Sequence, residues 1–213
     1  FDYLFGHTGG AVLPIYDRIN SRIDAGEKVP RVVMYAQEPG AGHAAEGYAK
    51  VNCDHKPGLV LVTSGPGATN LVTPIADAYK DSVPVIFLTG QVPSKALGTD
   101  AFQEVPIVQI TNCITKYGRI ITSTDEIGRE LRTAYHIATS GRPGPVLLDI
   151  CKDALLGSST NGNDGGSLPG YHPDSDVRLN EKEADRLLEA FMNSEKPVIY
   201  AGGGVVSSNS SVQ

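Results

Sequence analysis

Five short segments of the sequence combine glycines with polar or charged residues, and such segments are where chemistry can be placed. They are Gly6–Ala11, Gln37–His43, Ser64–Asn70, Gly90–Pro93 and Gly98–Glu104. The first four directly follow short apolar runs, and the fifth lies in a long irregular connection. Glycines allow a ligand to approach the backbone closely. In open parallel sheets, ligands bind beyond the carboxyl ends of the strands, so these segments are expected to surround a ligand.

Glu38 is the residue best suited to catalysis. It follows an apolar run that we predict to be a buried strand, and it precedes Pro39 and a predicted helix. Partial desolvation favours the neutral carboxyl, whereas the N-terminus of the helix favours the carboxylate. A carboxyl balanced in this way can share a proton with a ligand nitrogen. The alternative interpretation is an acid that only stabilises the start of the helix.

Other site types find little support in the sequence. Ser64–Asn70 is not a P-loop, because no Gly-Lys-Ser/Thr follows, and it is not a nucleophile elbow, because Val62 replaces the required glycine. A tight corner between strand and helix explains this segment equally well. The five histidines lack metal-ligand spacing, so no metal site is expected within the chain, and His43 is expected to pack or cap.

Short apolar runs alternate with helix-like segments along most of the chain. The predicted strands are Tyr3–Phe5, Arg31–Tyr35, Leu59–Thr63, Val85–Leu88, Ile107–Ile110 and Val146–Ile150. The predicted helices are Ala11–Asp24, Ala41–Val51, Ala68–Tyr79 and Glu126–Thr139, the last with Asp125 as its N-cap. Nearly continuous Val, Ile and Leu are typical of strands covered on both faces. The fold class is therefore α/β, a parallel sheet with helices on both faces.

The composition changes near residue 157 and indicates a second domain. Residues 157–176 carry few apolar side chains, which predicts a flexible linker after a domain spanning residues 1–156. Residues 177–213 are expected to begin a second α/β domain. Asn180 with Glu183 predicts a capping box, and Pro197–Ala201 before three glycines predicts a strand. The chain starts without Met and stops soon after that strand, which suggests a piece of a longer protein.

Composition and charge exclude several functional classes. Hydrophobic residues make up 40% of the chain and charged residues 20%, as in soluble globular proteins. No apolar run is long enough to span a membrane. A net charge of −6 without a basic cluster argues against binding to nucleic acid. Three distant cysteines indicate neither a disulfide framework nor a zinc site.

In order along the chain, these motifs resemble the N-terminal, pyrimidine-binding domain of thiamine-diphosphate-dependent enzymes, and within that family the catalytic subunits of acetolactate synthases. The resemblance covers about residues 1–155 and rests on Gly9–Asp17, Gly40–Lys50, Thr63–Asn70, Gln91–Pro93, Gly98–Glu104, Gly141–Val146 and Lys152–Asp153. Some positions depart from the family. Gln37 and Pro39 stand where His and Gln are usual, and His7-Thr8 stands where Tyr-Pro is common.

The resemblance implies a role for individual residues. Glu38 matches the glutamate that bonds N1′ of the aminopyrimidine and promotes removal of the thiazolium C2 proton. Gly10 and Ala11 match positions lining the reaction pocket, where a backbone amide can face a developing oxyanion. Gln103 matches a residue of the catalytic pocket. The residues matching the substrate entrance are Ala11, Phe102, Gln103 and Lys152, and Arg142 matches a contact to FAD. Without the resemblance, Arg142 and Lys152 are interpreted as solvated cations.

The resemblance also implies cofactors and partners. Thiamine diphosphate, Mg²⁺ and FAD are expected, with Mg²⁺ bound by a domain absent from this chain, because no Gly-Asp-Gly motif follows a strand here. A second catalytic subunit, in a homodimer or larger assembly, would complete the active site, and a regulatory subunit is a further partner. The 213 residues alone are expected to be inactive. The location would be cytoplasmic in bacteria and mitochondrial or plastid in eukaryotes.

Three alternatives remain open at this point. Another thiamine-dependent enzyme, such as glyoxylate carboligase or pyruvate oxidase, shares the Glu38 and Thr63–Asn70 features. A Rossmann-type nucleotide-binding module is a second class, although no Gly-x-Gly-x-x-Gly opens a helix. A non-catalytic assembly domain is the third, supported by the missing diphosphate motif.

Overall fold

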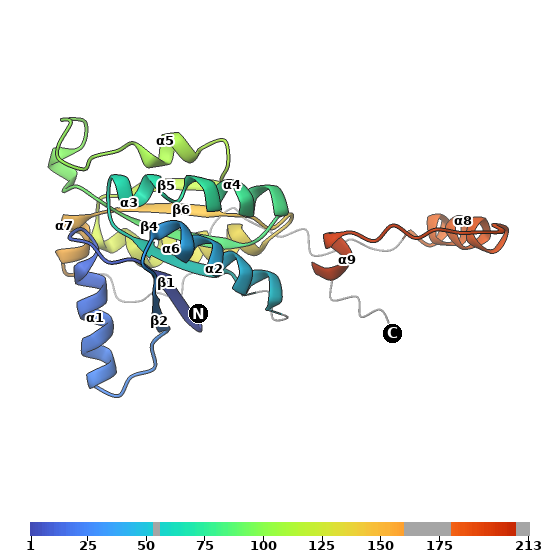
Figure 1. The fold of residues 1–213 in the computed structure, drawn as a ribbon, viewed down its shortest axis with the longest axis horizontal. Helices are drawn as coiled ribbons and strands as arrows, with labels where there is room; N and C mark the ends of the chain where they lie inside the picture. The colour runs from blue at the N-terminus through green and yellow to red at the C-terminus, as the bar shows by residue number, and fades with distance from the viewer. Residues whose placement is uncertain (53–55, 160–179, 208–213) are drawn as a thin grey trace. The chain divides into compact units, whose positions relative to one another are not determined.

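The chain folds into two compact units, residues 1–169 and 170–213, in a computed structural model that describes residues 1–52, 56–159 and 180–207. Unit 1 contains one six-stranded sheet with the order β2-β1-β3-β4-β6-β5, and every neighbouring pair is parallel (Figure 1). The strands are β1 (Tyr3–Gly6), β2 (Arg31–Met34), β3 (Gly58–Val62), β4 (Val85–Gln91), β5 (Tyr117–Ile121) and β6 (Val146–Cys151). The predicted α/β class is confirmed.

Helices cover both faces of this sheet. They are α1 (Leu13–Asp24), α2 (Glu38–Val51), α3 (Pro66–Thr69), α4 (Val72–Asp81), the 3-10 helix η1 (Ser94–Ala96), α5 (Ile107–Thr111), α6 (Thr124–Thr139) and α7 (Lys152–Leu156). One hydrophobic cluster joins the sheet to α2, α3, α4 and α5, and a second joins its other face to α1, α6 and α7. Figure 1 shows α3, α4 and α5 above the sheet and α1 projecting below it.

The central strands are buried throughout, as their apolar runs predict. Every residue of β3, β4 and β6 is buried. The expectation that the strand before Glu38 is buried was wrong, because β2 forms an edge of the sheet and exposes Arg31 and Met34. The Glu38 carboxylate is instead contacted from α3, by Asn70 at its C-terminal end, with Gly67 beside it.

The predicted strand Ile107–Ile110 was wrong: these residues form helix α5. Pro106 precedes the helix, Ile107 and Thr111 are buried one turn apart, and the Thr111 hydroxyl donates to the Ile107 carbonyl over 2.8 Å. A short apolar run does not distinguish a buried helix from a strand. The strand that the prediction lacked is β5, at an edge of the sheet. Its Gly118 allows Val108 of α5 to approach closely.

Several helices begin or end at other residues than predicted. Helix α2 begins at Glu38 rather than at Ala41, and the predicted helix Ala68–Tyr79 is divided into α3 and α4. Asp125 is not the N-cap of α6. Ser123 has that role, because its side chain accepts a hydrogen bond from the Asp125 amide.

Unit 2 contains α8 (Glu181–Met192) and α9 (Gly203–Ser207). The Asn180 side chain caps α8 by accepting from the Glu183 amide over 3.4 Å, which confirms that half of the predicted capping box. The predicted strand Pro197–Ala201 was wrong: these residues adopt no strand, and Val198, Ile199 and Tyr200 are exposed. A strand requires a hydrogen-bonded neighbour, and the described part of unit 2 offers none. Most of the predicted linker, residues 160–176, lies outside the described residues.

Candidate active site at the carboxyl ends of the strands

Hydrogen bonds join the segments that follow β1 and β2. They place the start of α2 at the carboxyl edge of the sheet. The Tyr35 amide donates to the Gly6 carbonyl over 2.9 Å, and the Tyr35 carbonyl lies 2.7 Å from Nδ1 of His7. Gln37 is extended and acts as the N-cap, and Glu38 is the first residue of α2. Proline suits the first turn of a helix, so Pro39 fixes where α2 begins.

The Glu38 carboxylate is held by residues that follow β3. Asn70 Nδ2 donates to Glu38 Oε2 over 3.0 Å. A Cβ at Gly67 would lie only 3.3 Å from Glu38 Oε1, so the glycine gives the carboxylate room. Glu38 itself is half-buried. The Asn70 amide thereby orients Glu38 Oε2, whereas Oε1 lies beside Gly67, which has no side chain.

Gly65 brings the Gly98–Glu104 segment onto the same site. It has a φ of 59°, which favours glycine, and a Cβ there would lie 2.8 Å from the Gln103 carbonyl oxygen. The Ser64 hydroxyl donates to Gln103 Oε1 over 3.5 Å. The segment Ser64–Asn70 therefore makes more than a tight corner: it joins Glu38 and Gln103, which are 65 positions apart in the sequence.

Thr63 connects the segment after β1 to this cluster. The Ala11 amide donates to Thr63 Oγ1 over 3.4 Å, a long bond, and a Cβ at Gly9 would collide with the Thr63 side chain. Ala11 is buried, whereas Gly10 is exposed, with open space where a Cβ would lie. The structure thus brings Glu38, Ala11 and Gln103 together around residues 63–70, with Gly10 at the accessible rim.

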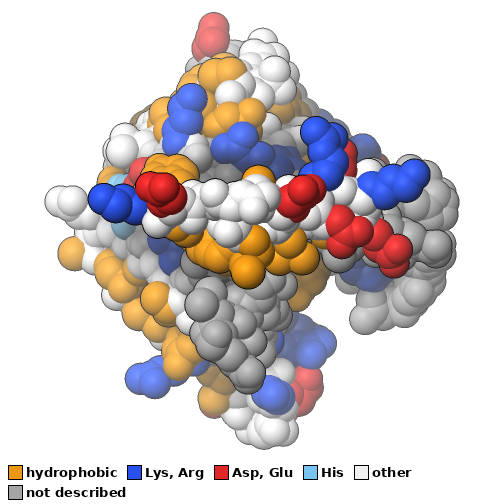
Figure 2. Space-filling model, turned by 90° about the vertical axis from the view of Figure 1, so that its right-hand side faces the viewer, with side chains coloured by type: hydrophobic (Ala, Val, Ile, Leu, Met, Phe, Trp, Pro, Cys, Tyr) orange, Lys and Arg blue, Asp and Glu red, His pale blue; other side chains and the backbone are white. Residues whose placement is uncertain are grey.

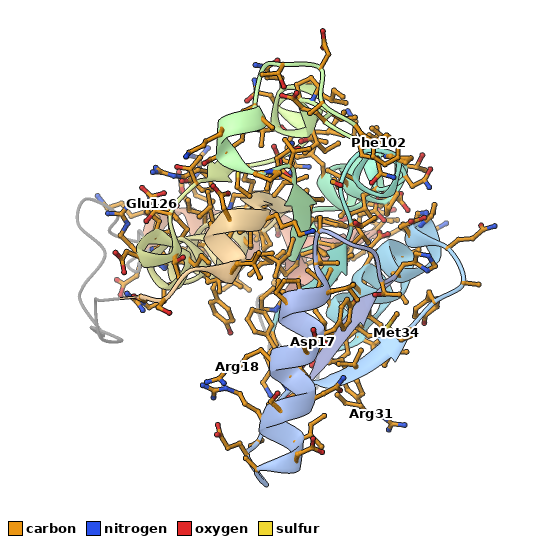
Figure 3. The ribbon with its side chains drawn as sticks, turned by 90° about the vertical axis from the view of Figure 1, so that its left-hand side faces the viewer. Asp17, Arg18, Arg31, Met34, Phe102 and Glu126 are labelled. Carbon is orange, nitrogen blue, oxygen red and sulfur yellow. The ribbon has the colours of Figure 1, made fainter. Side chains whose placement is uncertain are left out.

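The remaining predicted residues lie farther away. Phe102 neighbours Gln103 in the sequence and is 88% exposed. Figure 3 labels its side chain at the upper right, away from α1 in that view. Lys152 begins α7 at the same edge of the sheet and has no hydrogen bond to Glu38 within the described chain. Arg142 precedes β6, so it lies at the opposite edge, where it donates to Ser82 Oγ over 2.7 Å.

A second charged cluster lies between α2 and α4. His43 Nδ1 is 3.2 Å from Glu46 and 3.6 Å from Asp77, so one potential ligand atom from each of the three side chains lies within 4.8 Å of the others. Lys50 already supplies a positive charge, 2.8 Å from Glu46 and 2.7 Å from Asp81, and these two carboxylates raise its pKa. We interpret the cluster as an ion-pair network that joins the two helices.

On the face shown in Figure 2, Lys and Arg side chains lie among Asp and Glu rather than forming a broad basic area. Among the described helices, none is both long and apolar enough to cross a membrane.

Sequence reasoning missed three polar residues near the site. Asn70, which holds Glu38, was included only as part of a motif. Thr89 and Asp149 are fully buried in β4 and β6. The signal for these two was available, because each is a polar residue inside an otherwise apolar strand.

Replacing Gly67 by alanine is expected to weaken the site. The new methyl would lie 2.8 Å from the Thr63 methyl and 3.3 Å from Glu38 Oε1, so the carboxylate must shift. For thiamine diphosphate, the ligand that the sequence resemblance implies, we expect affinity measured by titration to fall about tenfold, since overpacking typically costs about 1–3 kcal/mol. Gly47→Ala is the matched control, because Gly47 lies in α2 with open space around it. Equal affinity in both variants would contradict a contact between the Glu38 carboxylate and that ligand.

Comparison with known proteins agrees with this geometry. The family described as "Thiamine pyrophosphate enzyme, N-terminal TPP binding domain" matches residues 1–110. An acetolactate synthase large subunit of Mycobacterium tuberculosis is 48% identical over 214 residues, covering 100% of this chain and 33% of the relative. The mitochondrial acetolactate synthase catalytic subunit of Saccharomyces cerevisiae is 42% identical over 215 residues, covering 97% of this chain and 30% of the relative.

A bacterial relative from another lineage gives the same result. The acetolactate synthase large subunit of Lactococcus lactis is 46% identical over 210 residues, covering 98% of this chain and 35% of the relative. The chain thus spans about a third of the length of these relatives. Because the family model covers more than half of the chain and the sheet carries Glu38 at the expected edge, the chain belongs to the thiamine pyrophosphate enzymes and contains their N-terminal cofactor-binding domain.

Proposed function

We propose that this chain provides the pyrimidine half of a thiamine diphosphate site in an enzyme that makes acetolactate. Such an enzyme decarboxylates pyruvate and ligates the two-carbon unit to a second 2-oxo acid. The carrying observation is the Glu38 carboxylate, held by Asn70 beside Gly67 at the carboxyl ends of the strands. The relatives, named acetolactate synthases in bacteria and fungi, support this reaction over that of a sister carboligase or oxidase.

Glu38 fits an aminopyrimidine because its two oxygens have different surroundings. Oε2 accepts from Asn70, and Oε1 is available to a ring nitrogen of the cofactor. In a half-buried site a carboxyl can share a proton with that nitrogen, which is the role proposed for it. When bound, thiamine diphosphate supplies the nucleophilic carbon and the electron sink for decarboxylation. Asn70 would keep the carboxylate in one orientation throughout.

The residues around Glu38 would form the substrate end of the pocket. We assign Gly10 and Ala11 to the lining, with a backbone amide facing the developing oxyanion. The long bond from the Ala11 amide to Thr63 supports this role, because a weakly held donor is easily shared with substrate. Gln103 would contact the reacting groups. Phe102, exposed on the same segment, and Lys152 would line the entrance.

Mg²⁺ and FAD complete the proposed cofactor set. The diphosphate and Mg²⁺ would be held outside these residues, because no Gly-Asp-Gly motif follows a strand in the chain. Arg142 suits an anionic or carbonyl group of FAD, because it is exposed and, within the described part of the chain, it donates to Ser82 and Lys80 and keeps further N–H donors for a ligand. Since Arg142 lies at the edge opposite Glu38, FAD would contact this domain away from the pyrimidine.

Partners and location follow from the same proposal. The half-site requires a second catalytic subunit, in a homodimer or a larger assembly. The names "large subunit" and "catalytic subunit" given to the relatives support a regulatory subunit as well. The relatives include bacterial proteins and a yeast protein whose name describes it as mitochondrial. A cytoplasmic location in a bacterial source, or a mitochondrial or plastid one in a eukaryote, is therefore proposed.

Product analysis tests this function. The full-length protein, meaning the longest natural chain that contains residues 1–213, would be incubated with pyruvate, thiamine diphosphate, Mg²⁺ and FAD. We expect acetolactate, and with 2-oxobutyrate added the corresponding acetohydroxybutyrate. Residues 1–213 alone are expected to form neither product. In parallel reactions, acetyl phosphate formed from pyruvate with added phosphate and oxygen, or a product formed from added glyoxylate, in place of acetolactate, would contradict the proposed reaction while leaving the family assignment intact.

A further inference from the structure

Three polar side chains lie inside the sheet, next to the candidate site. Asp149 on β6 is fully buried, and Thr89 and Gln91 on β4 are 1% and 2% exposed. The Thr89 hydroxyl donates to Asp149 Oδ1 over 2.6 Å, and Gln91 Nε2 donates to Asp149 Oδ2 over 2.7 Å. Both carboxylate oxygens are therefore used within the core. None of these residues has a role in the chemistry proposed above.

The Gln91 amide extends this array to the backbone beyond the sheet. Its Oε1 accepts from the Val92 amide over 2.8 Å, where the chain leaves β4. Its Nε2 also donates to the Val105 carbonyl over 3.0 Å, where the chain returns before α5. One side chain thus fastens both ends of the segment 92–105. Asp149 fixes the orientation of that amide by accepting from the same nitrogen.

The fastened segment carries Phe102 and Gln103 in a demanding backbone conformation. Asp100 and Gln103 have φ values of 55° and 63°, which non-glycine residues rarely adopt and which persist only when their surroundings constrain them. The Glu104 carboxylate provides one constraint, because it accepts from the amides of Gly98, Thr99 and Ala101. The Gln91 amide provides the other, at the ends of the segment.

Stability alone is a poor explanation for a carboxyl at this position. Asp149 lies on the sheet face where Leu147 packs with Ile107, in an otherwise apolar cluster. Burying a carboxyl there costs free energy, and an apolar residue of similar size is often neutral or stabilising. Burial raises the pKa of Asp149 to about 7, against the opposing effect of its two hydrogen bonds. This cost supports a role in positioning.

We propose that Gln91, oriented by Asp149, is a positioning residue that holds the segment 92–105 so that Gln103 faces the reacting groups beside Glu38. This inference rests on the proposed function for its catalytic consequence only. The structural consequence, an immobilised segment, is independent of which reaction the enzyme performs. Thr89 acts through Asp149 by occupying the other carboxylate oxygen.

The test compares Gln91→Met with Gln109→Met in the full-length protein. Methionine keeps the size of glutamine but has no amide, and Gln109 is an exposed residue of α5 that serves as the matched control. Amide hydrogen exchange of residues 92–105 is expected to rise about tenfold in Gln91→Met, with β4 and β6 unchanged, since the segment loses the hydrogen bond that holds its Val105 end. We also expect kcat/KM for acetolactate formation to fall about tenfold, with unchanged affinity for thiamine diphosphate.

Two outcomes would overturn the proposal. Exchange of residues 92–105 within twofold of the control would show that Gln91 does not fasten the segment. Exchange that rises equally in β4 and β6 would show that the array only stabilises the core. If Gln91→Met does not fold, Gln91→Asn decides by the same readout, because its shorter side chain cannot reach both Asp149 and Val105. If the wild type forms no acetolactate, the proposed reaction fails, and the exchange measurement still decides the positioning.

Discussion

Replacing Glu38 by glutamine is expected to reduce acetolactate formation by the full-length protein by at least about 100-fold, since positioned acid–base groups typically contribute 10²–10⁴-fold. Glutamine keeps the size of the side chain and can still pair with Asn70, so the fold and the start of α2 should persist. What is lost is the ability to share a proton with the cofactor nitrogen. The measurement is kcat at saturating pyruvate and thiamine diphosphate.

The matched control for this experiment is Glu27→Gln. Glu27 is exposed and pairs with Arg22 beyond the end of α1, so the same chemical change there should leave kcat within about twofold. Surface ion pairs of this kind contribute little to stability. An active Glu38→Gln enzyme would remove Glu38 from the mechanism and favour the interpretation of Glu38 as a helix-stabilising acid.

The second large effect concerns the pH dependence of folding stability at Asp149. Its pKa rises from 3.8 to about 7 on burial. Below about pH 4 the carboxyl is protonated in both folded and unfolded chains, so it contributes no pH dependence. Between pH 4 and 7 the unfolded chain is ionised while the folded chain keeps the proton, so unfolding releases a proton and rising pH favours it. Above about pH 7 both are ionised, and the dependence ends.

The magnitude follows from the pKa difference. One pKa unit corresponds to 1.36 kcal/mol, so ionising Asp149 lowers the free energy of unfolding by up to about 4 kcal/mol between pH 4 and 8. Asp149→Asn should lack this decline, because the Asn amide does not ionise in this range. The Asn side chain can also keep both contacts if the Thr89 hydroxyl turns to accept. Nearby Cys151 stays neutral over this range, since burial, with smaller effects from Asp153 and Asp149, raises its pKa to about 12.

Urea unfolding of wild type and Asp149→Asn from pH 5 to 8 measures the effect. Other titrating groups are common to both proteins, so the difference between the two curves isolates Asp149. We expect the advantage of Asp149→Asn to grow as the pH rises and to level off above about pH 7. Parallel curves would indicate that Asp149 ionises at its ordinary pKa and is solvated in the folded protein.

Burial decides which parts of the fold could be predicted from the sequence. The strands β3, β4 and β6 are covered on both faces, so their continuous apolar runs identified them. Strand β5 lies at an edge and contains Gly118 and Arg119, so its pattern was too weak to recognise. The adjacent apolar run at Ile107 forms a helix that buries one side, because Ile107 and Thr111 pack one turn apart rather than alternating.

The candidate site was predictable in position but not in its contacts. A carboxylate after β2 must lie at the carboxyl edge of a parallel sheet, which identified Glu38 from pattern alone. Its bond to Asn70 spans 32 positions and depends on how closely α2 and α3 approach, which Gly67 permits. Local sequence contains no information about that approach. The family resemblance, rather than periodicity, indicated Gln103.

The hydrogen-bonded group of Thr89, Gln91 and Asp149 was predictable only in part. Alternation along β4 and β6 already places Thr89, Gln91 and Asp149 on one face of their strands. Their meeting requires β4 and β6 to be neighbours, with Thr89 opposite Asp149 in the register. In sequence order β5 lies between them, and it was assigned to the wrong segment. Topology, and not residue type, was therefore the missing information.

The most direct test of the central claim is the exchange rate of the thiazolium C2 proton of thiamine diphosphate bound to the full-length protein, followed by NMR in deuterium oxide. Glu38 is proposed to promote loss of this proton through the aminopyrimidine. We expect exchange in Glu38→Gln to be slower than in wild type by about 100-fold or more, with the cofactor bound in both. Equal exchange rates would contradict the account, because Glu38 would then have no part in activating the cofactor.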